Sequence, residues 1–401
     1  MPPLHSISGT LLLTESPSTT RLVPGTVHLR GQSIDAIQLD PSSKPNLTNP
    51  LLILPAFVDA HLHLPQYDSI GIDGLPLLDW LERAIFPAEA RWEDAQHAAE
   101  MTVRVAKDLV SFGTTAFAAY ATVHHAAAQG AIDALATLNL TAHVGQVLMD
   151  QEAPAELIRP ADRLIAECAS LRAQGRIHPS INPRFAITCS RALLHAAGDL
   201  ASKTGRFVQT HLAETVPECA RVRELHHESS YTDVYAAAGL LSPTSLLAHA
   251  IHLSDGERTT LSRARAVAAH CPTANRFLNS GVMDRQSLAS AGVPIALGSD
   301  IAGGPDRSMV RVARAMVDAV KQLGHRPPTA GAAWHAITAG NAALLGFEDL
   351  GVLRAHARAD LILARPTIPL TAPDPLSTLL YAWDDRWIES VFVAGVPAYS
   401  R

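Results

Sequence analysis

The 401-residue sequence predicts an α/β fold, in which a barrel of eight parallel strands is joined to a small β-sandwich domain. Two observations predict the barrel. Apolar runs that end in polar residues recur about eight times along the middle of the chain, and stretches with helical spacing separate them. Such alternation is typical of a parallel sheet covered on both faces. About eight units over roughly 300 residues is the count of a (β/α)₈, TIM-type barrel.

The predicted strands follow one another in chain order. They lie within residues 51–63, 114–122, 141–150, 179–188, 206–214, 245–253, 266–272 and 293–300. The intervening stretches, such as residues 90–113, have the spacing of helices. An open doubly wound sheet is the alternative, but no GxGxxG follows the first apolar run, so its strongest cofactor signature is absent.

The two chain ends have a different pattern, with short β-prone pieces broken by Pro, Gly and Ser. Such pieces predict short antiparallel strands. We therefore expect one composite β-domain, built from residues 1–54 and 351–401, and a (β/α)₈ barrel domain over residues 55–350.

Composition excludes several classes of protein. The net charge of -6 and the lack of a basic stripe argue against a nucleic-acid-binding surface. No apolar run reaches the ~18 residues of a membrane span. The four cysteines form no CxxC pair, and no Lys or Arg precedes the first apolar run, as a secretory signal would require. We expect a cytoplasmic protein without membrane or nucleic-acid partners.

Residues that can bind metals recur at the ends of predicted strands, where a parallel barrel carries its reactive groups. His61 and His63 end the first strand, and because they are two residues apart, both imidazoles can point to the same side. His211 ends the fifth strand and Asp300 the eighth. Each alone has an ordinary structural explanation, but their joint placement favours a site for zinc or a similar divalent ion.

Further groups near these ends suit hydrolysis. A metal can lower the pKa of a bound water from about 15.7 to about 7. Glu214 lacks the spacing of a ligand but is well placed as a proton shuttle. His249 could bind the metal or orient the water, and we favour orientation. For His270, structural and catalytic roles stay equally open.

Two other zinc arrangements fit less well. The cytidine-deaminase type needs HxE followed by PCxxC, and the chain has no PCxxC. A two-metal barrel with a bridging carboxylated lysine is also disfavoured, since residues 179–188 contain no lysine. We therefore expect one metal ion.

Longer segments carry a family resemblance. The segment PAFVDAHLHLPQY, at residues 55–67, resembles the opening signature of the amidohydrolase superfamily. Its PQY ending and the block LPLLDWLERAIFPAEARW resemble the guanine deaminase family in particular, as do HCPTAN and LGSDIAGGPDRSM. The resemblance runs from about residue 50 to about residue 350, and GVLRAHARADLIL resembles the family's closing β-segment.

The resemblance implies hydrolytic deamination of guanine to xanthine and ammonia, as part of purine catabolism, by a homodimer with one Zn²⁺ per subunit. The implied zinc ligands are His61, His63, His211 and Asp300. Guanine is implied to lie among Gln66, Arg184, Phe185 and Glu214, next to His211 and Asp300. A metal-activated water would attack C2, with Glu214 protonating N3 and Asp300 passing the water's proton to the leaving ammonia.

The chemistry of the implied pocket agrees with a purine. Gln66 offers a donor and an acceptor to a purine edge. Arg184 can donate to the oxygen at C6, and Phe185 offers an apolar face to a flat ring. Trp80 could line the pocket or serve packing. The alternative is an aminohydrolase of the same fold acting on cytosine, an adenosine derivative, a pterin or a triazine; a non-catalytic binding protein would lack a ligand or the shuttle.

Overall fold

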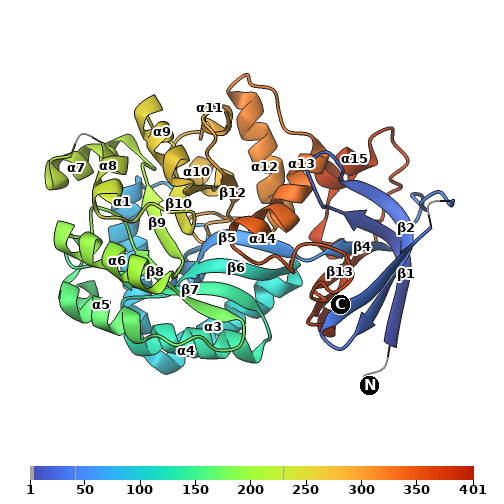
Figure 1. The fold of residues 1–401 in the computed structure, drawn as a ribbon, viewed down its shortest axis with the longest axis horizontal. Helices are drawn as coiled ribbons and strands as arrows, with labels where there is room; N and C mark the ends of the chain where they lie inside the picture. Colours follow the sequence, from blue (N-terminus) through green and yellow to red (C-terminus); the bar gives the residue numbers. More distant parts are fainter. Residues whose placement is uncertain (1–3, 41, 229) are drawn as a thin grey trace.

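The computed structural model describes residues 4–40, 42–228 and 230–401, so residues 1–3 and 41 of the predicted β-domain lie outside it. Two sheets dominate the structure (Figure 1). One is an eight-stranded parallel sheet in the order β12-β11-β10-β9-β8-β7-β6-β5, and the other is a seven-stranded mixed sheet at one end of the molecule.

The parallel sheet is the predicted barrel. Its strands are β5 (Phe57–His63), β6 (Thr114–Tyr120), β7 (Thr141–Leu148), β8 (Ile177–Pro183), β9 (Val208–Leu212), β10 (Ser245–His249), β11 (Val267–His270) and β12 (Ile295–Leu297). Backbone hydrogen bonds join the segment that follows β12 to β5. There the Asp300 N–H donates to the His61 carbonyl at 2.8 Å, and the His63 N–H donates to the Ile301 carbonyl at 2.9 Å. The TIM-type fold is confirmed.

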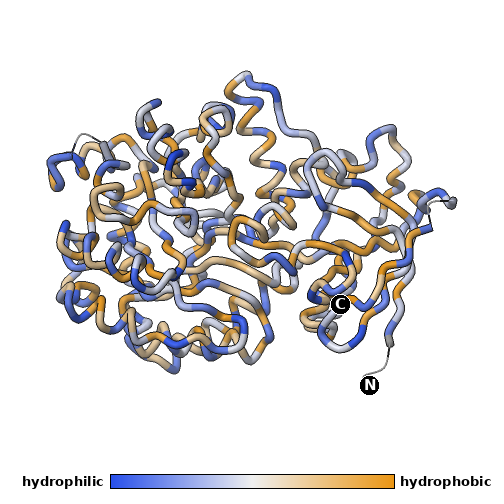
Figure 2. The backbone as a smooth tube through the Cα atoms, viewed as in Figure 1, coloured by the Kyte–Doolittle hydropathy of each residue, from blue (hydrophilic) through white to orange (hydrophobic). Residues whose placement is uncertain are grey.

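Helices surround the barrel, and α15 lies beside the mixed sheet (Figure 1). They are α1 (Leu77–Trp80), α2 (Phe86–Ala90), α3 (Ala95–Ser111), α4 (His125–Thr137), α5 (Ala161–Ser170), α6 (Arg191–Thr204), α7 (Val216–His226), α8 (Tyr231–Ala237), α9 (Asp255–Ala264), α10 (Pro272–Phe277), α11 (Arg285–Ser290), α12 (Met309–Gln322), α13 (Ala330–His335), α14 (Asn341–Leu344) and α15 (Pro375–Ala382). Helix α3 begins after Asp94, whose carboxylate accepts from the backbone N–H groups of Gln96 and His97. Figure 2 shows the apolar character of the barrel strands beneath mixed-polarity helices.

The mixed sheet is built from both chain ends, as predicted. Its strands are β1 (Leu4–Leu13), β2 (Arg21–Arg30), β3 (Ser33–Leu39), β4 (Leu52–Pro55), β13 (Leu361–Ala364), β14 (Ile388–Val393) and β15 (Val396–Ser400). β1 and β4 pair in parallel, whereas the other neighbours pair antiparallel. The composite character of the sheet is confirmed, while the boundaries at residues 54 and 351 stay predictions.

The first apolar run, expected as one strand, forms two. β4 pairs with β13 in the mixed sheet, and β5 pairs with β6 in the barrel. Ala56 alone separates them, and its N–H donates to the carbonyl of Asp360 at 3.1 Å. With one residue between β4 and β5, the chain passes directly from one sheet into the other. The strand that ends in His61 and His63 is thus anchored at its start by the mixed sheet.

Two further features concern the helices and the cysteines. Across the described ranges, none of the helices has both the length and the apolar character needed to cross a membrane. All four cysteines, Cys168, Cys189, Cys219 and Cys271, are buried and free.

Candidate active site

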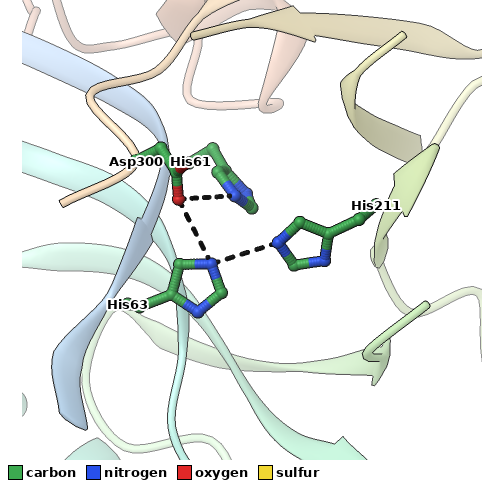
Figure 3. A group of neighbouring side chains, drawn as sticks. All are labelled: His61, His63, His211 and Asp300. Carbon is green, nitrogen blue, oxygen red and sulfur yellow. Dashed lines mark hydrogen bonds and ion pairs between the residues drawn. The ribbon is translucent and has the colours of Figure 1, made fainter. Parts of the chain in front are cut away.

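Three imidazoles and one carboxylate meet where the barrel strands end (Figure 3). His61 and His63 come from the end of β5, His211 from β9, and Asp300 from the segment after β12. One ligand atom of each lies within 4.8 Å of the others. Nε2 of His61 and Nε2 of His63 are each 3.4 Å from Oδ1 of Asp300, and the Nε2 atoms of His63 and His211 are 3.2 Å apart. The structure therefore brings together the four residues predicted as ligands.

Hydrogen bonds behind the imidazoles orient two of the rings. Nδ1 of His61 donates to Oε1 of Gln209 at 2.9 Å, and Nδ1 of His211 donates to the carbonyl of Arg184 at 2.6 Å. Because a neutral imidazole carries one N–H, each Nε2 keeps its lone pair for the centre of the group. Burial lowers the pKa of His63 to about 3 and the pKa of His211 well below its usual value, so these two rings stay neutral, as ligands must be.

The donor set fits a divalent cation. Nε2 of His61 is buried and makes no hydrogen bond to any residue that the structure describes. A lone pair on Nε2 of His211 faces Nε2 of His63 at 3.2 Å. Buried polar atoms without a partner are rare, and an ion among these nitrogens would satisfy them. Nitrogen ligands with one carboxylate suit zinc and related metals.

Asp59 fixes the two chain segments that carry three of these ligands. Its Oδ1 accepts from the backbone N–H of His61 at 3.1 Å and from that of Ser299 at 2.9 Å. The side chain is buried, and burial raises the pKa of Asp59 to about 6. Asp300 follows with a φ of 50°, a left-handed conformation that costs a non-glycine residue energy and is characteristic of functional sites. Asp59 therefore sets where His61 and Asp300 stand relative to each other.

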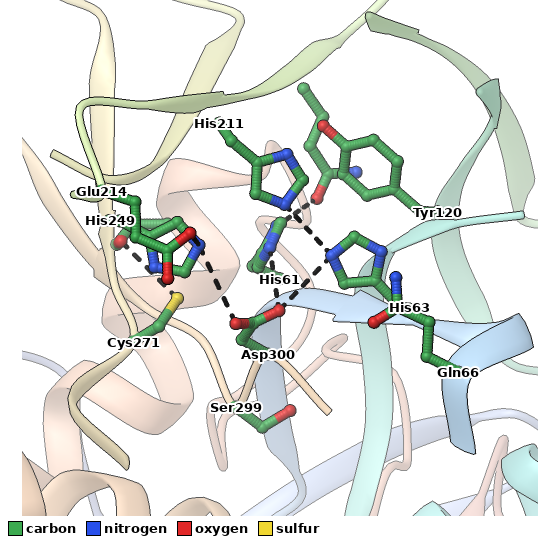
Figure 4. A network of polar contacts seen from close by, with 12 residues as sticks. His61, His63, Gln66, Tyr120, His211, Glu214, His249, Cys271, Ser299 and Asp300 are labelled. Carbon is green, nitrogen blue, oxygen red and sulfur yellow. Dashed lines mark hydrogen bonds and ion pairs between the residues drawn. The ribbon is translucent and has the colours of Figure 1, made fainter. Parts of the chain in front are cut away.

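Glu214 and His249 lie beside the metal group (Figure 4). Nε2 of His249 is 3.4 Å from Oε2 of Glu214 and 3.8 Å from Oδ2 of Asp300. Burial raises the pKa of Glu214. Burial alone would lower the pKa of His249, but the carboxylates of Glu214 and Asp300 outweigh it and raise that pKa. Both groups can therefore exchange protons, and His249 stands outside the four-residue group that could hold a metal.

One pocket of about 380 Å³, part of it open to solvent, joins these groups to the predicted substrate residues. Its lining consists of His63, Gln66, Leu77, Trp80, Leu81, Arg184, Phe185, His211, Glu214, His249, Leu278 and Asp300. His270 is buried at the end of β11 and is not part of this lining, and burial lowers its pKa to about 3. A structural role for His270 agrees with this position.

Sequence reasoning missed Glu89, a buried residue of α2 behind the pocket. Its Oε1 accepts from Nε2 of Gln66 at 2.9 Å and from Nη1 of Arg184 at 2.5 Å. Glu89 lies in the FPAE segment of the LPLLDWL block. A glutamate on a short helix is usually exposed to solvent, so the sequence pattern did not indicate its burial. A usable signal did exist, because an arginine buried in a pocket needs a carboxylate partner.

Comparison with known proteins agrees with this geometry. The model of the Amidohydrolase family matches residues 52–397. The chain belongs to the amidohydrolase family. Guanine deaminase of Escherichia coli strain K12 is 32% identical over 367 residues, which cover 87% of this chain and 83% of that protein. The predicted resemblance of this amidohydrolase to guanine deaminases is confirmed.

Two solved structures of guanine deaminases show the same likeness over nearly the whole chain. E. coli guanine deaminase superimposes with a TM-score of 0.91 at 27% identity, covering 100% of both chains. Guanine deaminase from C. acetobutylicum, solved with guanine bound in its active site, has a TM-score of 0.90 at 27% identity and covers 99% of this chain and 100% of that one.

Proposed function

We propose that this amidohydrolase is a guanine deaminase, which hydrolyses guanine to xanthine and ammonia with one Zn²⁺ per subunit. One observation carries the proposal. A cationic donor, Arg184, and an amide, Gln66, line the same pocket as Glu214 and three members of the metal group, His63, His211 and Asp300. The relatives that match most of the chain, among them a structure with bound guanine, support this substrate.

The pocket residues suit the edge of guanine that carries N1–H and the oxygen at C6. The guanidinium of Arg184 donates to that oxygen, and Gln66 hydrogen-bonds to the neighbouring ring nitrogen. The ring of Phe185 packs against the face of the purine. This placement turns C2 and its amino group toward Glu214 and Asp300.

The reaction adds water and releases ammonia, so two protons must be moved. His61, His63, His211 and Asp300 would hold a divalent ion, which would supply a water activated for attack on C2. Glu214 takes up the first proton of the water and delivers it to N3 of the ring. Asp300 takes up the second proton of the water and passes it to the departing amino group. His249, between both carboxylates, orients the water.

The proposed metal rests on the ligand types, and the proposed location rests on the cysteines. Three imidazoles with one carboxylate favour zinc over magnesium or calcium, which prefer oxygen ligands. Four free cysteines suit a reducing compartment, and we propose a cytoplasmic location and a homodimer.

The substitution Glu214→Gln tests the proposal, with ammonia release from guanine and bound zinc as the two measurements. The variant keeps the size of the side chain but cannot shuttle a proton, so kcat should fall by about 10²–10⁴-fold while the zinc content stays the same. The matched control is Glu224→Gln, since Glu224 is exposed on α7. Full activity in Glu214→Gln would end the assignment of the shuttle, and inactive wild-type protein would end the assignment of guanine.

A further inference from the structure

We propose that Glu89 is a positioning residue that makes the pocket selective for a lactam edge, in which a ring N–H stands next to a carbonyl. Glu89 does so through Gln66 and Arg184 and without lining the pocket itself. The inference rests on the proposed function, because it names the group that enforces the choice of guanine over adenine.

Glu89 determines which end of the Gln66 amide faces the pocket. A carboxylate can only accept hydrogen bonds, so the partner that Gln66 turns toward Glu89 must be its NH₂ group. The other end of the amide, Oε1, is therefore left for a ligand. Free in solution, a glutamine can present either end, whereas beside Glu89 it presents an acceptor.

Glu89 also positions Arg184. The same oxygen of Glu89 accepts from Nη1 of Arg184 at 2.5 Å, so one carboxylate oxygen sets the distance between the amide and the guanidinium. The Arg184 guanidinium also lies 5.3 Å from the ring of Phe86, a residue of the same helix as Glu89. Helix α2 thus contacts the cation through a charge and through an aromatic ring.

Burial restricts the movement of all three side chains. Glu89 is 1% exposed, Gln66 2% and Arg184 3%, so these side chains have little room to turn. The backbone of Glu89 is also tied to the barrel, because Oγ1 of Thr122 donates to its carbonyl at 3.3 Å. Oε2 of Glu89 is buried and has no partner among the described residues. The carboxylate therefore depends on Gln66 and Arg184 for its stabilisation, and the three act as one unit.

The held pair is complementary to a lactam. Guanine offers N1–H to the acceptor of Gln66 and its C6 oxygen to Arg184. Adenine offers the reverse pattern, with an acceptor at N1 and an amino group at C6, so its amino protons would face the Arg184 cation and its N1 the Gln66 oxygen. A polar pattern that leaves buried groups unpaired discriminates strongly between ligands.

The substitution Glu89→Gln tests this role, with steady-state kinetics on guanine and competitive inhibition by hypoxanthine and adenine. Hypoxanthine has the lactam edge but no amino group at C2, so it reports binding alone. A neutral amide can donate as well as accept, which frees Gln66 to turn. We expect KM for guanine and the inhibition constant of hypoxanthine both to rise about 10- to 100-fold, with kcat within about 3-fold and the adenine constant unchanged or lower.

Two further variants separate positioning from general damage. Glu82→Gln, on the exposed face of the preceding turn, should leave every constant unchanged. In a Gln66→Leu background, Glu89→Gln should cost less than in the wild type, because one of the two residues through which it acts has gone. Should Glu89→Gln fail to fold, Glu89→Asp keeps the charge but shortens its reach, and the same KM and hypoxanthine shifts are expected at smaller size.

The outcomes are distinguishable. Unchanged KM and hypoxanthine inhibition in a folded Glu89 variant, or equal losses with and without Gln66, would overturn the positioning role while wild-type turnover of guanine still supports the proposed function. Wild-type protein that leaves guanine unchanged would overturn the proposed function, and this inference with it.

Discussion

Oδ1 of Asn275 lies 2.8 Å from Nδ1 of His249. The amide oxygen accepts, so the proton on Nδ1 is fixed and Nε2 faces the carboxylates of Glu214 and Asp300. The ring therefore has one defined orientation beside the metal group, although Asn275 itself lies on α10, outside the strands that carry the ligands.

Asn275→Leu should lower kcat for guanine by about 10- to 100-fold, because the imidazole loses the partner that fixes its tautomer. KM and zinc content should change little, since Asn275 neither lines the pocket nor belongs to the metal group. The comparison variant is Arg276→Gln, whose side chain is exposed on the same helix. Equal rates in the two variants would contradict a role for this hydrogen bond.

We expect Ser280 to affect the acid limb of the pH profile. Its Oγ donates to Oε1 of Glu214 at 2.7 Å, and this bond favours the ionised carboxylate and lowers a pKa that burial has raised. The shuttle must be ionised in the free enzyme to take up a proton. In Ser280→Ala, the pKa of Glu214 should rise further, so the acid limb of kcat/KM should move to higher pH by up to about one unit. Ser290→Ala, at an exposed residue, is the control and should leave the acid limb in place. An acid limb of Ser280→Ala that stays in place or moves to lower pH would contradict the assignment of Glu214.

Asp59 should matter for stability as well as for metal binding. Asp59→Ala removes the acceptor for two buried backbone N–H groups and should lower the free energy of unfolding by about 2–4 kcal/mol. Asp59→Asn keeps an oxygen acceptor and should lose much less. Thermal unfolding and zinc analysis of both variants check the order. A fully stable, zinc-loaded Asp59→Ala variant would show that β5 and the end of β12 need no such clamp.

The sequence predicted the metal group because barrel geometry places strand ends together. His61, His63, His211 and Asp300 are far apart in the chain, but parallel strands of a closed barrel all end at one rim. Position along the strand was therefore enough to bring these residues into one place. The pocket residues Gln66, Arg184 and Phe185 were found through the family resemblance, and they too line the same pocket.

The hydrogen bonds behind the site could not be found in the same way. Glu89, Asn275 and Ser280 lie on short helices or loops, where sequence spacing does not define which side is buried. Their contacts depend on how α2 and α10 pack against the barrel. The division of residues 51–63 between two sheets was missed for a related reason, since an apolar run shows burial but not which partner strand provides it.

Xanthine formation from guanine by the zinc-loaded chain, measured before and after a chelator removes the metal, tests the central claim most directly. The account predicts one xanthine and one ammonia for each guanine consumed, loss of turnover on chelation, and recovery with one equivalent of Zn²⁺ per subunit. Folded, zinc-loaded protein that leaves guanine unchanged, or turnover that persists without any metal, would contradict it.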